Sequence, residues 1–366
     1  MYSNKIPSLN IGDLEINPPI IQGGMGVRVS KANLAAAVAN EGGVGVIATV
    51  GLGEFENLPG SEFVRVNNEA LIQELRKARS MTDGIIGVNV MVALSNYKEL
   101  TVTAAKEGVD IIISGAGLPL DLPELVEGTS TKLVPIVSSA RALSIICKKW
   151  ERQFNRSPDA VIVEGAKAGG HLGFGYEELI DGTVPELDMI LSEVIEAANS
   201  FDPPVPVIAA GGIWDGKDIA RVLDLGASGV QMATRFVCTN ECDVHRNFKQ
   251  AYIDATEDDI TIIKSPVRMP GRVINNAFVE KIKRGETIPF KCSYRCLKTC
   301  NPRTAPYCIA KVLLGAAKGN FKEAFAFAGK NAYRCTEIIP VKQLTDQLTE
   351  EAVYHLRKRQ MKQCQA

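Results

Sequence analysis

Short apolar runs rich in Val and Ile recur through the first 240 residues, and glycine directly follows many of them. They are shorter than typical helices, and they lack the polar–apolar alternation of a strand with one face in water. Short, continuous apolar runs of this kind are typical of parallel strands that are buried on both faces. We therefore predict eight such strands, at residues 19–21, 45–48, 86–90, 110–113, 133–137, 160–163, 205–209 and 229–232.

Segments with apolar residues at helical spacing lie between these runs. They cover residues 31–40, 67–79, 97–106, 140–152, 187–198 and 214–225, with a less regular stretch at 121–128. Ser30 is the expected N-cap of the first. Such alternation is typical of a closed barrel or a doubly wound open sheet, and the count of eight favours the α/β (β/α)8 TIM barrel. We predict the barrel over residues 1–240, followed by a smaller, mainly helical region over 241–366.

The composition narrows the class of protein. A formal net charge of −1 gives no general attraction to nucleic acid or to an anionic membrane. No apolar run reaches the roughly 20 residues that span a bilayer, and the first residues lack a secretory pattern. We expect a cytoplasmic protein that acts on a small molecule. The oligomeric state stays open, a homodimer included.

Two glycine-containing turns follow the seventh and eighth expected strands. One contains Gly211 and Gly212, and the other runs from Gln231 to Thr234. In TIM barrels these two turns commonly bind a phosphate group. The alternative is a pair of tight turns without a ligand. Because no GxGxxG motif follows the first strand, a ligand with one terminal phosphate, such as flavin mononucleotide (FMN) or a sugar phosphate, fits better than a dinucleotide.

A glycine-rich loop after the sixth expected strand contains His171. It is the only one of the three histidines at the carboxyl end of a predicted strand, where barrel enzymes place their catalytic groups. Imidazole can accept or donate a proton near neutral pH. His171 is therefore either a catalytic acid or base, or a histidine packed in the loop.

Seven motifs occur in the order of a known family. They are IIQGGMG (20–26), LAAAVANEGGVGVIA (34–48), GVN (87–89), SGAG (114–117), VEGAKAGGHLG (163–173), PVIAAGGI (206–213) and VQMATRF (230–236). Over roughly residues 6–280 the chain resembles the 2-nitropropane dioxygenase superfamily. This superfamily includes nitronate monooxygenases and the enoyl-acyl-carrier-protein reductase II enzymes.

The resemblance implies non-covalently bound FMN and assigns expected roles. Gly24, Met25 and Gly26 would contact the flavin ring, while Asn89 and Glu164 would hydrogen-bond the flavin or its ribityl chain. His171 would be the catalytic histidine over the substrate. Gly169 and Gly170 would pass close to the cofactor, and its phosphate would bind to Gly211, Gly212, Gln231, Met232, Ala233 and Thr234.

Three residues depart from the family pattern. Ala233 replaces a glycine, which requires a negative φ there. Glu164 replaces a glutamine common in nitronate monooxygenases and matches the enoyl reductases. Lys330, in Ala328-Gly329-Lys330, replaces a glutamine and leaves the substrate pocket uncertain.

Four cysteines of the tail form the pattern C-x3-C-x3-C-x7-C, at Cys292, Cys296, Cys300 and Cys308. In a helix, spacing by four would place the first three thiols on one face. Four thiolates could bind zinc or an iron–sulfur cluster. The alternative is a set of reduced thiols that pack as small apolar side chains.

These observations predict an FMN-dependent oxidoreductase of the nitronate monooxygenase type, in which His171 manages the proton or the charge of a small carbanion. The closest alternative is an enoyl-acyl-carrier-protein reductase II that takes electrons from NAD(P)H. A non-redox phosphate-binding barrel and a module working through the cysteine segment are the alternatives from other classes.

Overall fold

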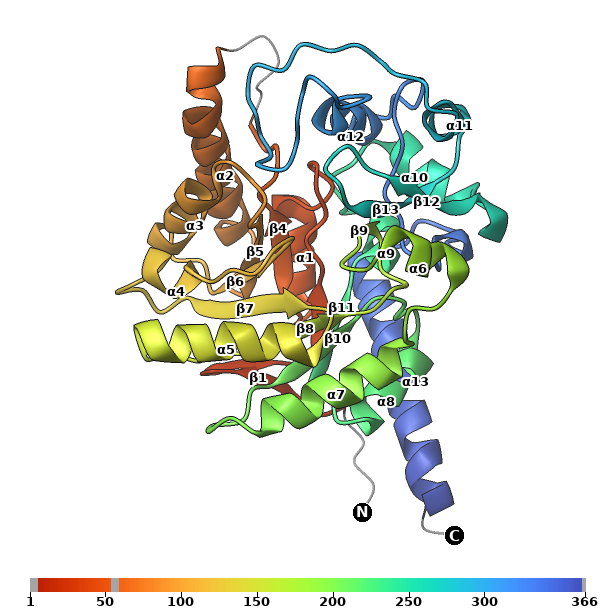
Figure 1. Ribbon diagram of the computed structural model, residues 1–366. Helices are drawn as coiled ribbons and strands as arrows, with labels where there is room; N and C mark the ends of the chain where they lie inside the picture. Colours follow the sequence, from red (N-terminus) through yellow and green to blue (C-terminus); the bar gives the residue numbers. More distant parts are fainter. Residues whose placement is uncertain (1–5, 54–58, 364–366) are drawn as a thin grey trace.

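The computed structural model describes residues 6–53 and 59–363. Eight parallel strands form one sheet, and its two end strands meet through a parallel bridge between Ile21 and Val44. The predicted (β/α)8 barrel is therefore confirmed (Figure 1). In sheet order the strands are β3 (Ile20–Gln22), β11 (Gly229–Met232), β10 (Val207–Ala210), β8 (Val161–Glu164), β7 (Lys132–Val137), β6 (Ile111–Gly115), β5 (Ile86–Met91) and β4 (Gly45–Ala48).

The helices around the barrel begin and end within a few residues of the predicted segments. Each buries its apolar face against the strands; α5 buries Leu143, Ile146 and Trp150. The outer helices are α1 (Ala32–Asn40), α2 (Phe63–Arg79), α3 (Tyr97–Lys106), α4 (Leu122–Leu125), α5 (Ala140–Phe154), α7 (Leu187–Asn199) and α8 (Gly216–Asp224). Two shorter helices, α6 (Tyr176–Asp181) and α9 (Thr234–Val237), follow β9 and β11.

An N-terminal hairpin closes one end of the barrel. Its strands, β1 (Leu9–Ile11) and β2 (Leu14–Ile16), pair antiparallel. Leu9, Ile11 and Ile16 are fully buried in the cluster that fills the barrel interior. Because this end is filled with side chains, a ligand site is left to the opposite end, where the strands have their carboxyl termini.

The region after residue 240 adds helices and a hairpin that reaches the barrel. The helices are α10 (Arg246–Ile253), α11 (Ala277–Lys283), α12 (Ile309–Ala317) and α13 (Val341–Gln363). Strands β12 (Ile260–Lys264) and β13 (Pro270–Ile274) pair antiparallel, and β13 also pairs with β9 (Gly170–His171) of the histidine loop. The mainly helical tail thus contributes two strands of a three-stranded sheet that the sequence did not predict. The division of the chain at residue 240 stays a prediction.

The prediction that Ser30 caps the first helix, α1, is wrong. The Ser30 hydroxyl instead accepts a hydrogen bond from the Met25 backbone N–H, at 2.9 Å. The free N–H groups at the start of α1 are satisfied by side chains from far along the chain: Asp243 accepts from Lys31 and Leu34, and Glu74 accepts from Ala32. Side chains brought close by the tertiary fold thus provide the hydrogen-bond acceptors that a local capping residue would otherwise provide.

Within the described residues, no helix combines the length and the apolar character needed to cross a bilayer.

Candidate functional site

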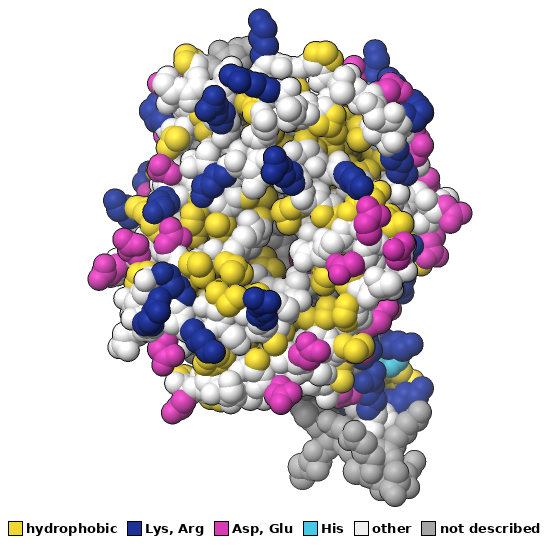
Figure 2. Space-filling view, in the orientation of Figure 1, with side chains coloured by type: hydrophobic (Ala, Val, Ile, Leu, Met, Phe, Trp, Pro, Cys, Tyr) yellow, Lys and Arg dark blue, Asp and Glu magenta, His cyan; other side chains and the backbone are white. Residues whose placement is uncertain are grey.

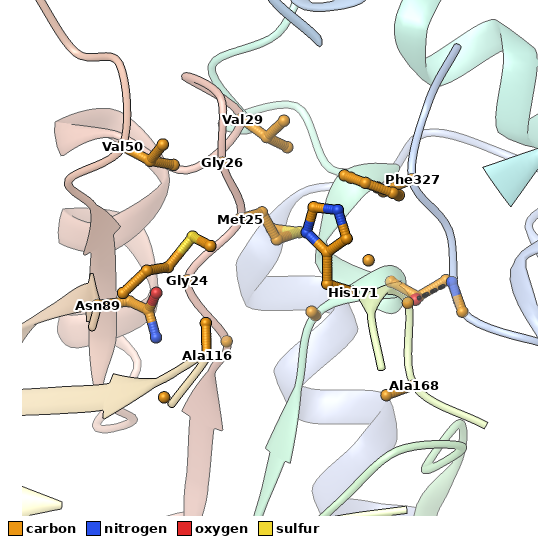
Figure 3. Close-up of a pocket in the computed structure, with 18 of the residues that line it drawn as sticks. Gly24, Met25, Gly26, Val29, Val50, Asn89, Ala116, Ala168, His171 and Phe327 are labelled. Carbon is orange, nitrogen blue, oxygen red and sulfur yellow. Dashed lines mark hydrogen bonds between the residues drawn. The ribbon is translucent and has the colours of Figure 1, made fainter. Parts of the chain in front are cut away.

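A cavity of about 280 Å³ opens at the carboxyl ends of the barrel strands. The structure brings together in its wall His171 and every residue that the sequence proposed for the cofactor (Figure 3). These are Gly24, Met25, Gly26, Asn89, Glu164, Gly169, Gly170, Gly211, Gly212, Gln231, Met232, Ala233 and Thr234. Their individual roles stay predictions, but their convergence on one cavity is now a feature of the fold.

Several glycines line one wall of the cavity. Gly24 packs so closely on the Asn89 side chain, and Gly26 on Val50, that a Cβ at either position would clash with its neighbour. Gly170 differs, since its φ is +78° and a Cβ there would meet no atom within 4 Å. Glycine is thus required by packing at the first two positions and by backbone conformation at the third.

The turns after β10 and β11 form a second wall. Gly211 and Gly212 have φ values of +89° and +93°, which glycine adopts without strain. The Thr234 hydroxyl accepts a hydrogen bond from the Gly329 N–H at 3.0 Å, so its own proton remains available to an anion. The buried Oε1 of Gln231 has no hydrogen-bond partner among the described residues. A buried acceptor of this kind is costly unless a ligand or water supplies a donor.

His171 lies on β9 beside Met25 in the cavity wall (Figure 3). Its Nε2 lies 2.8 Å from the Ser265 hydroxyl, and its ring meets the Phe327 ring edge-on at 4.9 Å between centroids. Burial lowers the pKa of His171 to about 4. The imidazole is therefore neutral at physiological pH, and Nδ1 is the nitrogen left to act on a group in the cavity.

A buried arginine of β13 is hydrogen-bonded to the backbone of the histidine loop. The Arg272 guanidinium, on β13, donates hydrogen bonds to the backbone carbonyls of Ala166 and Ala168 at 2.5 and 2.6 Å. Burial lowers its pKa to about 10, so it remains charged at neutral pH. The hairpin thus fixes the loop through Arg272 and the imidazole through Ser265.

Glu164 ends β8 inside the cavity, and burial raises the pKa of its carboxyl group to about 7. The folded protein without ligand therefore holds a proton here between pH 4.5 and 7 that the unfolded chain has released. The contribution of this proton to the free energy of unfolding is fully present below pH 4.5 and is lost as the pH rises to about 7. We expect the free energy of unfolding of flavin-free wild type, relative to Glu164→Gln, to fall across this interval in denaturant titrations. A pH-independent difference would contradict the burial of this carboxyl group.

A second part of the same cavity is apolar and was not foreseen. It is lined by side chains from the βα loops, from α2 and from α12, together with two residues of the cysteine segment. We call it the apolar arm; its lining is Val27, Val50, Phe63, Leu94, Cys296, Leu297, Ile309 and Leu313. Burying a carbon skeleton here would be favourable.

Sequence reasoning missed the parts of the site that the tail provides. Nothing in the local pattern marked Ser265, Phe327 or Asn331, whose side-chain amide donates to the Gly212 carbonyl at 2.9 Å. Of the three departures from the family pattern, two are resolved. Ala233 has a φ of −115°, which alanine adopts freely, and Lys330 forms an ion pair with Glu257 outside the cavity.

The cysteine segment does not present a metal site. No three His, Cys, Asp or Glu side chains in residues 6–53 and 59–363 are placed to hold a metal ion. The helical face expected for Cys292, Cys296 and Cys300 is absent, because residues 286–308 form no helix. The metal prediction is therefore not confirmed; only Cys296 reaches the cavity.

Comparisons with known proteins find relatives over most of the chain. A 25% identical relative, a probable nitronate monooxygenase of Bacillus subtilis, covers 92% of this chain and 97% of its own. A carboxyl-CoA dehydrogenase of Mycobacterium tuberculosis is 28% identical over 74% of this chain and 66% of its own, so the match spans just under two thirds of that relative. The structure of FabK from Thermotoga maritima superposes with a TM-score of 0.73, at 28% identity, over 93% of this chain and 94% of its own.

The family model described as nitronate monooxygenase matches residues 8–107 and 93–351, which is most of the chain. The chain therefore belongs to the nitronate monooxygenase family of oxidoreductases.

Proposed function

We propose that this protein is an FMN-dependent oxidoreductase that oxidises a small nitronate-like carbanion, with His171 acting on the substrate. The observation that carries the proposal is the convergence of a glycine-lined wall, an unpartnered buried acceptor and a neutral imidazole on one cavity. A planar ring with a phosphorylated chain satisfies these features together.

The residues present fit FMN. Gly170, where a Cβ would meet no atom within 4 Å, leaves the backbone open to the close approach of a flat ring. Gln231 Oε1 awaits a donor, which the N–H and ribityl hydroxyl groups of the cofactor offer. The turn backbone at Gly211 and Gly212 and the Thr234 hydroxyl would hold the phosphate. Bound there, FMN would supply the electron acceptor for substrate oxidation.

The role of His171 follows from its neutral state. A neutral imidazole can take the α-proton of a nitroalkane, or donate an N–H hydrogen bond to the oxygens of a nitronate. When the Ser265 hydroxyl accepts from Nε2–H, Nδ1 keeps its lone pair for the proton; when Ser265 donates, Nδ1–H faces the anion. The ring does not serve as a permanent positive charge, because its pKa of about 4 is too low.

Enoyl-thioester reduction with NAD(P)H is the second candidate, and the apolar arm favours it. That arm is lined by apolar side chains and would suit a longer acyl chain. The likeness to FabK, an enoyl-acyl-carrier-protein reductase, and to a carboxyl-CoA dehydrogenase supports this candidate too. Glu164 also matches the residue expected of enoyl reductases.

A spectrum followed by steady-state assays tests the proposal. The purified protein is expected to show flavin absorption bands and to oxidise propyl-2-nitronate with consumption of dioxygen. A colourless protein with no affinity for added FMN would leave a non-redox phosphate-binding barrel. Rapid NAD(P)H oxidation with crotonyl-thioester turnover, and none with nitronate, would assign the enoyl reductase activity instead.

A further inference from the structure

The cavity wall contains a second unpaired polar side chain besides Gln231. Among the buried side-chain nitrogen and oxygen atoms that have no hydrogen-bond partner within the described residues, only Gln231 Oε1 and Asn96 Nδ2 belong to residues that line the cavity. Asn96 is only 2% exposed, so bulk water does not satisfy its amide. A buried amide without a partner destabilises the folded chain, and its presence calls for a ligand or a bound water molecule.

The local structure does not explain why asparagine stands at this position. Asn96 is the N-cap of α3, where asparagine is favoured because its side-chain oxygen can accept a hydrogen bond from a backbone N–H of the first turn. Here the side chain forms no such bond, although the Asn96 backbone carbonyl accepts a helical hydrogen bond from the Leu100 N–H at 3.1 Å. The helix therefore fixes the backbone of Asn96 and leaves its amide for another partner.

Asn96 lies at the wall of the apolar arm. Two residues before it, Leu94 lines the arm and forms an antiparallel bridge with Leu297, which lines the arm from the cysteine segment. The Ser95 N–H donates to the Cys296 carbonyl at 3.0 Å. Figure 2 shows hydrophobic side chains around a hollow near the middle of the face that Figure 1 presents. A region of the cavity lined by apolar side chains thus has one amide with free hydrogen-bonding capacity at its edge.

We propose that Asn96 recognises a hydroxyl or keto oxygen on the apolar body of the substrate. This inference rests on the proposed function, in which the reacting carbanion lies beside His171, and it extends the substrate from a small nitronate to one with a longer, oxygen-bearing carbon skeleton. The skeleton lies in the apolar arm, and its oxygen bonds the Asn96 amide. Because an amide has both N–H donors and a carbonyl acceptor, a hydroxyl can pair with either end of it and a keto oxygen with the nitrogen.

This arrangement selects among substrates as well as binding them. Apolar pockets commonly use a few fixed polar groups to orient a ligand. A plain hydrocarbon chain in the arm leaves the Asn96 amide buried and unpaired, whereas an oxygenated chain supplies its partner. The same amide therefore favours the oxygenated substrate and disfavours the plain one.

Titration calorimetry with octanoate and its hydroxylated derivatives tests the proposal without turnover. A carboxylate resembles a nitronate in shape and charge, and moving the hydroxyl along the chain locates the oxygen site. We expect the purified protein to bind one derivative roughly tenfold more tightly than octanoate, which corresponds to about one net hydrogen bond. Equal or weaker binding of every derivative, or no binding at all, would overturn the proposal. Because only binding is measured, failure of the protein to oxidise nitronates is a separate result.

Asn96→Leu tests the residue itself, because leucine is similar in size and has no polar side-chain atom. The variant should lose the preference for the hydroxylated ligand and keep its wild-type affinity for FMN. A preference that persists in Asn96→Leu would disprove the assignment, and a loss of FMN affinity would show that the flavin is the partner of the amide instead.

Leu94→Ala is the matched control, since it removes apolar area from the same loop and leaves the amide in place. Both octanoate and the favoured derivative should bind it more weakly, while the roughly tenfold preference between them remains. Circular dichroism verifies that each variant is folded, and the titrations of wild-type protein stand even if a variant fails to fold. Loss of the preference in Leu94→Ala as well as in Asn96→Leu would contradict a specific role for the amide.

Discussion

Replacing His171 with alanine is expected to lower turnover by roughly 10²–10⁴-fold, the usual contribution of a positioned acid or base, while FMN stays bound. The imidazole contacts Ser265 and Phe327, and none of the features assigned to the phosphate depends on it. Its loss therefore removes proton handling at the substrate and leaves the cofactor site in place. Single-turnover reduction of the bound flavin by nitronate, together with flavin content, measures both effects.

His245→Ala is the matched control. That histidine is the N-cap of α10, where its Nδ1 accepts a hydrogen bond from the Asn247 N–H, and it does not line the cavity. We expect its turnover to match wild type. If both variants turn over at the wild-type rate, His171 is a packing residue and the proposed mechanism is lost.

Gly211→Ala is expected to weaken FMN binding by about 100-fold. At a φ of +89° a side chain costs about 1–3 kcal/mol of strain, and if the turn relaxes, restoring its FMN-binding shape costs that much again, or about 5- to 160-fold in affinity. Its Cβ would also lie 2.6 Å from the Gly165 carbonyl oxygen, so the turn must shift. The shift moves the backbone N–H groups that would face the phosphate. Fluorescence titration of flavin-free protein with FMN measures the change.

Gly108→Ala separates this effect from backbone strain alone. Gly108 has a similar φ of +73° in the loop before β6, and a Cβ there would meet no atom within 4 Å. Its variant should lose stability in thermal unfolding but keep the wild-type affinity for FMN. Equal FMN affinities in Gly211→Ala and Gly108→Ala would refute the phosphate assignment.

The barrel and most of the cavity wall were predictable because both follow from local pattern. Buried parallel strands must be short apolar runs, and the residues after them must meet at one end of a closed barrel. Once eight runs are recognised, Gly24, Asn89, Glu164 and Gly211 converge without any further information. The family motifs identified the same positions independently.

The cysteine spacing wrongly predicted a helical face, because the conformation of this segment is not set by its local pattern. A four-residue repeat implies one face only where the backbone is helical, and residues 288–308 form no helix but are hydrogen-bonded to the loop after β5. Spacing along the chain does not describe such tertiary contacts.

The sequence by itself determined the strand ends, and with them the glycine-lined wall and the place of His171, because these depend on residues near one another along the chain. Only the tertiary structure decided what surrounds the histidine. The hydroxyl of Ser265, 94 residues away, the Phe327 ring and the Arg272 guanidinium reach the histidine loop through the tail. Hydrogen bonds and packing between distant segments leave no periodic trace in sequence, so the chemistry of the imidazole became visible only in the folded chain.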